Sequence, residues 1–143
     1  MSNLRPTIVI YSDDSSVRQT LIAALGARVA ADLPEHEIKE FATGKALRMF
    51  LDKKGTAELF IVEGEATPEG GMGISRQLKD EVFQCPPVLL VTARPDDAWL
   101  AAWSRADAVI VHPIDPFTVA DRVATLLRQH ILATSLLVRT STH

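Results

Sequence analysis

Short, nearly uninterrupted apolar runs constrain the fold of this chain most strongly. Residues 7–11, 59–62, 88–91 and 108–111 are such runs, and segments with helical spacing of apolar residues separate them. A strand buried on both faces has this composition, and parallel strands need a crossover connection, usually a helix. The pattern therefore predicts an α/β domain with a parallel sheet covered by helices on both faces.

A weaker run at residues 36–42 alternates in polarity and is typical of an edge strand, which brings the number of predicted strands to five. Right-handed crossovers then favour the flavodoxin-like strand order 2-1-3-4-5. A long loop containing several glycines is expected at residues 63–73. Helices are predicted over residues 17–25, ending at Gly26, over 47–51, ending near Gly55 after a turn at Thr43-Gly44, and over 74–83, 96–105 and 116 to at least 129.

Composition limits the class of protein. The 143 residues suffice for one domain, and the net charge of −3 argues against nucleic acid as the main partner. The single cysteine, Cys85, excludes an intramolecular disulfide and a cysteine-rich zinc site, and we expect it to be an inert thiol in a reducing cytoplasm. The sequence contains no signal peptide pattern and no apolar stretch near the roughly 20 residues of a membrane span. We expect a single cytoplasmic domain over residues 1–143, with a core at about 7–130 and an extension of the last helix at 131–143.

Polar residues follow four of the predicted strands directly. In parallel α/β sheets the working site lies at the carboxyl ends of the strands, near the switch point between strands one and three. We therefore expect these residues to converge on one edge of the sheet. They are Ser12, Asp13 and Asp14, then Glu63, then Thr92, then His112 and Pro113.

This arrangement resembles the receiver domain of bacterial response regulators. That family has an acidic pair after strand 1, an acceptor Asp after strand 3, Thr or Ser followed by Ala after strand 4, and Lys-Pro after strand 5. Asp13, Thr92 and Pro113 match these positions, and the likeness extends from residue 7 to about 129. Within the family, the chain most resembles the atypical, stand-alone receivers of actinobacteria. The resemblance implies a CheY-like fold, a role in two-component phosphorelay signalling without an output domain or an enzymatic activity, and a sensor histidine kinase as a partner.

Several positions depart from the family pattern. Ser12 stands where the first acid belongs, Glu63 stands at the phosphoacceptor position, and His112 replaces the lysine. Val109 takes the place of the aromatic switch residue, and Arg105 that of a helix-ending glycine. We expect His112 and Glu63 to lie close enough to interact, because both follow strands that end at the same edge.

These departures weaken the chemistry that the resemblance implies. Mg²⁺ binding by Asp13 should be weak, since a typical site rests on one or two carboxylates and one of them is missing. Asp13 can alternatively be a helix N-terminal acid that the helix dipole favours. Glutamate is longer than aspartate by a methylene, and a misplacement of about 1 Å can cost roughly a hundredfold in rate. Glu63 is therefore interpreted as an imitation of the charge of a phosphorylated Asp, acting through protein contact.

Two other functions stay open. The first is a conventional phospho-receiver in which Glu63 substitutes for Asp. The second is a small flavodoxin-like cofactor-binding protein or enzyme that uses the loop at residues 63–73.

A partner surface is expected beside the fifth strand. Trp99 and Trp103 lie four residues apart and so share a helix face, close to Val109 in the expected fold. They either cover the edge of the core or, as we favour, contact a partner, because aromatic residues are enriched at interfaces. We expect a protein partner, without nucleic acid or membrane, and a homodimer through helices 4 and 5. The apolar residues 131–133 and 136–138 extend the last helix, and the polar end 139–143 should fray.

Overall fold

The computed structural model describes residues 5–64, 71–82, 84–93 and 102–141. Its five strands form one parallel sheet in the order β2-β1-β3-β4-β5, which confirms the predicted fold class and strand order. The elements are β1 (Thr7–Tyr11), α1 (Ser15–Leu25), β2 (Glu37–Phe41), α2 (Gly44–Asp52), β3 (Leu59–Glu63), α3 (Gly71–Glu81), β4 (Val88–Thr92), β5 (Ala108–Val111) and α5 (Pro116–Ser141).

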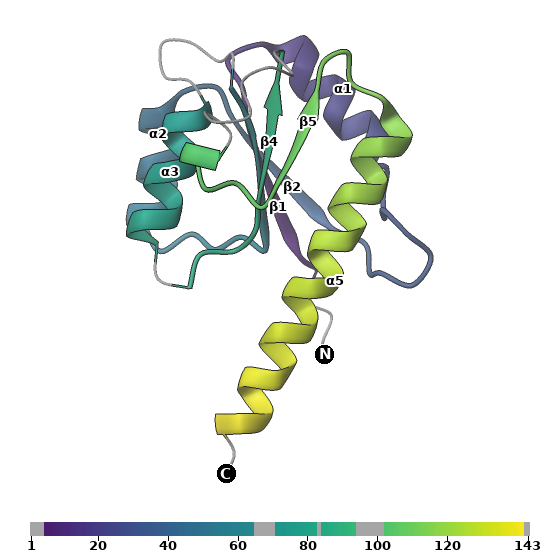
Figure 1. Cartoon of the computed structure of the whole chain (residues 1–143), viewed down its shortest axis with the longest axis vertical. Helices are drawn as coiled ribbons and strands as arrows, with labels where there is room; N and C mark the ends of the chain where they lie inside the picture. Colours follow the sequence, from purple (N-terminus) through teal and green to yellow (C-terminus); the bar gives the residue numbers. More distant parts are fainter. Residues whose placement is uncertain (1–4, 65–70, 83, 94–101, 142–143) are drawn as a thin grey trace.

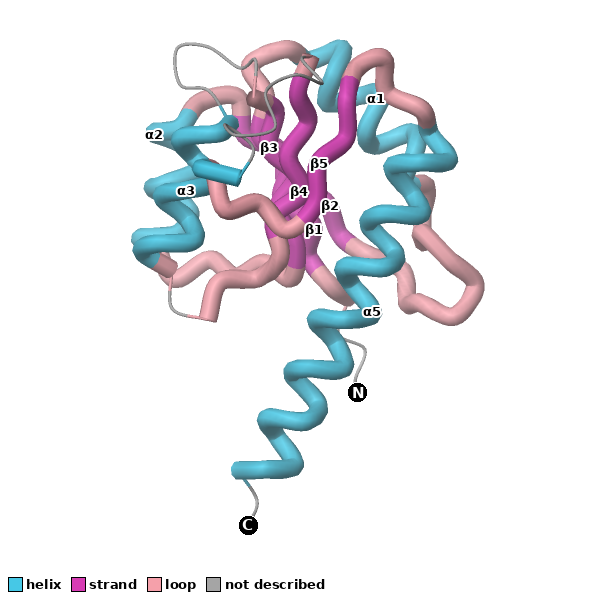
Figure 2. Tube along the Cα trace, in the orientation of Figure 1, coloured by secondary structure: helices cyan, strands magenta, loops and turns pink. Residues whose placement is uncertain are grey.

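Helices cover both faces of the sheet. Figures 1 and 2 show α1 and α5 on one face, with α2 and α3 on the other. Alternate residues of the central strands face the two layers, so Ile8 and Ile10 pack with the α1–α5 layer, whereas Val9 and Tyr11 pack with the α2–α3 layer. The strands β1, β3 and β4 are buried throughout, which explains their uninterrupted apolar sequences.

Two helices, α2 and α3, begin three residues earlier than the sequence predicted. Thr43 is not part of a turn: its side chain accepts from the backbone N–H of Ala46 and caps α2, which begins at Gly44. The helix predicted over residues 74–83 runs from Gly71 to Glu81, so the loop before it is shorter than expected. Glycine propensity suggested a loop there, but the burial of Ile74 and Leu78 against the sheet stabilises the helix.

The helix predicted over residues 96–105 falls mostly outside the described residues, and so does Trp99. Within the described part, residues 102–103 are helical and Arg105 has a φ of 62°. A left-handed conformation at this position accounts for the glycine that receivers usually carry there.

The last helix is much longer than the sheet requires. Its backbone is helical through Ser141, whereas residues 139–143 were expected to fray. Among the described residues, no helix combines the length and apolar character needed to cross a membrane.

Candidate functional site

The carboxyl ends of β1, β3 and β5 bring three side chains together. The register pairs Tyr11 with Val62 and Glu63 with Val91, so these parallel strands end at a common edge. Glu63 is the last residue of β3, while Ser12 and His112 directly follow β1 and β5. Ser12 and His112 lie 51 and 49 residues from Glu63 in the sequence, and the pairing of the strands brings them next to it.

Both carboxylate oxygens of Glu63 have a partner within the chain. The Ser12 hydroxyl donates to Oε1 over 2.5 Å, and His112 Nε2 lies 3.1 Å from Oε2. The Glu63 side chain is only 7% exposed and Ser12 is fully buried. The predicted contact between His112 and Glu63 is present. A carboxylate held in this way is shielded from solvent by the chain's own side chains.

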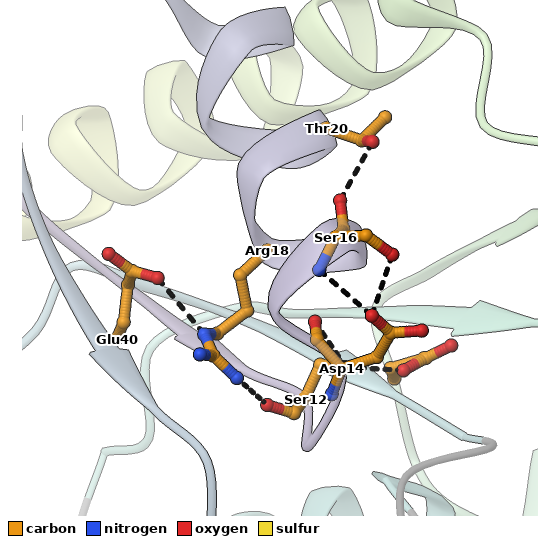
Figure 3. A network of polar contacts seen from close by, with 7 residues as sticks. Ser12, Asp14, Ser16, Arg18, Thr20 and Glu40 are labelled. Atoms are coloured by element: carbon orange, nitrogen blue, oxygen red, sulfur yellow. Dashed lines mark hydrogen bonds and ion pairs between the residues drawn. The ribbon is translucent and has the colours of Figure 1, made fainter.

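Ser12 is fixed from several sides. Its hydroxyl accepts from the backbone N–H of Asp14 at 3.1 Å while donating to Glu63, and its carbonyl accepts from Arg18 Nη1 at 2.6 Å. Arg18 Nε also pairs with Glu40 on β2 at 3.0 Å, as Figure 3 shows. Arg18 thus ties the loop after β1 to the edge strand. This role of Arg18 was not predicted from the sequence, where the only available signal was a basic residue one turn into the helix after β1.

The two acids that follow Ser12, Asp13 and Asp14, differ from Glu63 in burial, and Asp14 has different hydrogen-bond partners. The Asp14 carboxylate accepts from the backbone N–H and the hydroxyl of Ser16, at 2.8 and 2.6 Å, and so caps α1 (Figure 3). Hydrogen bonds from Ser16 hold the pKa of Asp14 below its usual value. Asp13 is exposed at the same loop. The structure therefore directs Asp14 to the helix end and not to Glu63.

The remaining predicted site residues lie at the ends of β4 and β5. Thr92 is buried, and its carbonyl accepts from the backbone N–H of His112 at 2.8 Å. The His112–Pro113 peptide bond is cis. Val109 is partly buried and packs against the α2–α3 side of the core. Backbone pairing thus positions His112 beside Glu63.

Three exposed apolar side chains lie on β5 or on the segments that flank it in the sequence. Trp103 is 46% exposed, Val111 37% and Phe117 86%. The Arg76 guanidinium lies 4.9 Å from the centre of the Trp103 ring and donates to the Trp103 carbonyl at 2.9 Å. Trp103 was predicted from the sequence, whereas the exposure of Phe117 and the contact of Arg76 with Trp103 were not, because they depend on tertiary packing.

Cys85 does not take part in these contacts. Burial raises the pKa of its thiol to about 11, so the thiol stays protonated at neutral pH. This agrees with the expected inert cysteine.

Comparison with known proteins decides the family. The chain is 50% identical over 121 residues to the response regulatory protein Rv3143 of Mycobacterium tuberculosis, and the match covers 85% of this chain and 90% of that protein. The response regulatory protein MT3230, from another strain of the same species, matches equally well. The chain belongs to the response regulator receiver family. This receiver accordingly has a place in two-component signalling, where sensor kinases are the general partners. No family model matches the chain.

Solved structures agree on the fold of this receiver. The CheY-like receiver of Methanospirillum hungatei superposes with a TM-score of 0.73 at 15% identity, covering 91% of this chain and 99% of that one. CheY4 of Vibrio cholerae superposes with a TM-score of 0.70 at 18% identity, and the match covers 86% of this chain and 99% of CheY4. DrrB of Thermotoga maritima gives 0.73 at 19% identity and covers 88% of this receiver, which spans 54% of the DrrB chain. The alternative of a flavodoxin-like cofactor-binding protein finds no support among these relatives.

Receivers typically bind Mg²⁺, and the residues of this receiver fit that ion poorly. Both oxygens of Glu63 are already engaged by Ser12 and His112, and Ser12 supplies a hydroxyl where an acid is usual. Within the described parts of the chain, no three His, Cys, Asp or Glu side chains gather in a way that could hold a metal ion.

Proposed function

We propose that this receiver acts by constitutive contact with a protein partner, its buried Glu63 taking the place of a phosphorylated Asp. The observation that carries the proposal is the double engagement of the Glu63 carboxylate by Ser12 and His112. A phosphorylated Asp places negative charge at this edge of the sheet. Glu63 supplies a carboxylate there permanently, and its two neighbours are already drawn onto it.

The same contacts oppose phosphorylation of Glu63. Acyl phosphate formation needs a carboxylate oxygen that can approach the phosphorus atom while the developing charge is neutralised. Each oxygen of Glu63 already makes one contact, which restricts its approach to a phosphorus atom. His112 replaces the lysine that receivers usually carry at this position, so the compact ammonium that could neutralise the developing charge is missing. We therefore expect this receiver to act as a docking module and to be phosphorylated weakly or not at all.

Phosphodonor labelling tests the proposal. The intact protein, incubated with acetyl phosphate and Mg²⁺, should gain little or no phosphoryl mass. Glu63→Asp should restore some labelling, and the triple variant Glu63→Asp, Ser12→Asp, His112→Lys should label more than the single changes suggest, because groups that act as a unit are not additive. Fast, stoichiometric labelling of the unmodified protein contradicts the proposal and favours a conventional phospho-receiver.

Weak Mg²⁺ binding belongs to the same proposal. Calorimetric titration at neutral pH should give a weak affinity for Mg²⁺, since one carboxylate is replaced by Ser12. A tight affinity that disappears in Asp13→Ala would show a functional metal site and contradict the proposal. Retention of the weak affinity in Asp13→Ala would instead exclude Asp13 as the ligand.

The partner surface is proposed to lie around β5. Trp103, Val111 and Phe117 expose apolar surface there, and Phe117 opens α5 directly after the loop that carries His112. An aromatic side chain that is 86% exposed gains much from contact with a partner. We expect Phe117→Ser to weaken capture of the partner, such as a sensor histidine kinase, without lowering stability.

A further inference from the structure

The carboxyl-terminal part of α5 leaves the body of the domain. Val119, Val123 and Leu127 are buried against the sheet and α1, but Ile131 is 37% and Leu132 61% exposed. A 26-residue helix is about 39 Å long, whereas a five-residue strand spans about 17 Å. Figures 1 and 2 show the helix passing the amino ends of the strands and continuing away from them.

This projecting part of α5, residues 131–141, is poorly suited to stand alone in water. It comprises about three turns, and isolated helices of that length are marginal even with favourable sequences. Its sequence contains Thr134, Ser135, Val138, Thr140 and Ser141, which are only moderate helix formers. Helices in proteins gain most of their stability from packing, so the projecting helix needs a surface to pack against.

The composition of the projecting helix shows what kind of surface it needs. The sequence holds no Asp, Glu, Lys or Arg between Arg128 and Arg139, and residues 131–133 and 136–138 are all apolar. At 3.6 residues per turn these positions fall on every side of the helix. A helix that is apolar all round is normally buried. Lipid surfaces usually recruit helices with a basic face, which the sequence between Arg128 and Arg139 lacks.

A groove opens where the projecting helix leaves the domain. It has a volume of about 590 Å³ and lies between α5 and the segments that precede β1, β2 and β3. Pro6, Pro34, Ala57 and Ile131 give it an apolar lining, and its polar lining residues are Arg5, Thr56, Glu58, His130 and Thr134. Ile131 belongs both to the groove and to the exposed helix surface, so the groove and the projecting helix adjoin.

We propose that this surface binds a second copy of the chain, with the projecting helices crossing at a two-fold axis and each helix lying over the groove of the other copy. A two-fold dimer uses the same surface on both copies, so the helix and the groove must be neighbours, as they are here. A standard interface buries about 800 Å² per partner, so both the helix and the groove of each copy have to take part.

The proposed dimer goes beyond the function proposed for Glu63 and holds whether or not Glu63 is phosphorylated. Leu132 and Phe117 are separated along α5 by about 22 Å, so the dimer leaves the surface around β5 open. The sequence predicted a homodimer through helices 4 and 5, and the proposed dimer uses only the end of helix 5. Each dimer would present two partner surfaces and gain avidity for a partner that is itself dimeric.

Sedimentation equilibrium of the full chain tests the proposal. The mass should approach twice the 15.6 kDa of one chain, and Leu132→Lys should weaken association roughly tenfold or more, because it places an unpaired charge in the interface. The matched control is Phe117→Lys, which changes an exposed apolar residue of the same helix far from the groove and should leave association unchanged. Circular dichroism of both variants checks that they fold.

A second variant tests the groove without altering the helix. Thr56→Arg places a long charged side chain at the groove and should also weaken association. A monomeric wild type across the micromolar range overturns the proposal. So does loss of association in Phe117→Lys but not in Leu132→Lys, which would assign the dimer to the β5 surface. Flotation of a monomeric wild type with anionic phospholipid vesicles would assign the projecting helix to a membrane and overturn the proposal as well.

Discussion

The two ends of the parallel sheet differ in whether their buried polar side chains are hydrogen bonded. At the carboxyl end, Ser12 and Glu63 are buried and hydrogen bonded to each other, and His112 completes the contact. At the amino end, both ring nitrogens of His36 and Oε2 of Glu58 are buried without a hydrogen-bond partner among the described residues. The buried polar side chains at the carboxyl end are thus hydrogen bonded to one another, whereas these two at the amino end are not.

The two buried groups at the amino end should make the stability of the protein depend on pH. Burial lowers the pKa of His36 below its ordinary 6.5 and raises the pKa of Glu58 above its ordinary 4.5. Both groups therefore favour their neutral forms in the folded protein. The two shifts act on stability at different pH and with opposite sign, so they can be separated by single substitutions.

The largest expected loss of stability comes from breaking the contact at the carboxyl end. Ser12→Ala removes the donor to a buried carboxylate oxygen and should lower the free energy of unfolding by about 1–3 kcal/mol. Urea denaturation at neutral pH measures this. The matched control is Thr20→Ala, which removes an exposed hydroxyl bonded to the Ser16 carbonyl on α1 and should change stability little. Equal effects of the two substitutions would show that the contact with Glu63 has no special weight.

A smaller effect, with a distinct pH dependence, is expected at His36. Its pKa is lower in the folded state, so the unfolded chain binds the additional proton. Stability is therefore complete above about pH 6.5 and falls as the pH drops below that value. His36→Phe should flatten this decline. Urea denaturation series from neutral to mildly acidic pH, run on both proteins, provide the comparison, and parallel curves would contradict the buried, neutral imidazole.

Glu58 should show the reverse sign and the smallest change. Its raised pKa means that its contribution is complete below pH 4.5 and is lost as the pH rises through the folded-state value. Glu58→Gln should therefore be modestly more stable than the wild type at neutral pH, with a difference that narrows toward pH 4.5. A difference that grows on acidification would refute this assignment. The measurement is the same denaturation series.

The sequence predicted the elements whose signals are local. Four apolar runs gave the inner strands and β5, and Asp14 and Gly26 cap α1 as their residue types suggest. The start of α3 at Gly71 was missed because packing of Ile74 and Leu78 outweighs the low helix propensity of glycine. Local pattern therefore predicts where an element lies better than where it begins.

The residues of the candidate site were predictable, and so was one of their contacts. The strand ends identified Ser12, Glu63 and His112, because parallel strands end at one edge, and this also predicted that His112 and Glu63 lie close together. The hydrogen bond from Ser12 to Glu63 was not predicted, since it depends on side-chain conformations across neighbouring strands. The role of Arg18, which joins the Ser12 carbonyl to Glu40 on another strand, was missed for the same reason.

The central claim is that the receiver's own side chains hold both oxygens of Glu63, and the nitrogens of His112 report on it most directly. Long-range ¹H–¹⁵N spectra of the imidazole at neutral pH should show a proton on Nε2 that exchanges slowly with solvent. That signal should be lost or exchange rapidly in Glu63→Ala and persist in the control Asp13→Asn. An unprotonated Nε2 in the wild type, or an unchanged signal in Glu63→Ala, would contradict the account.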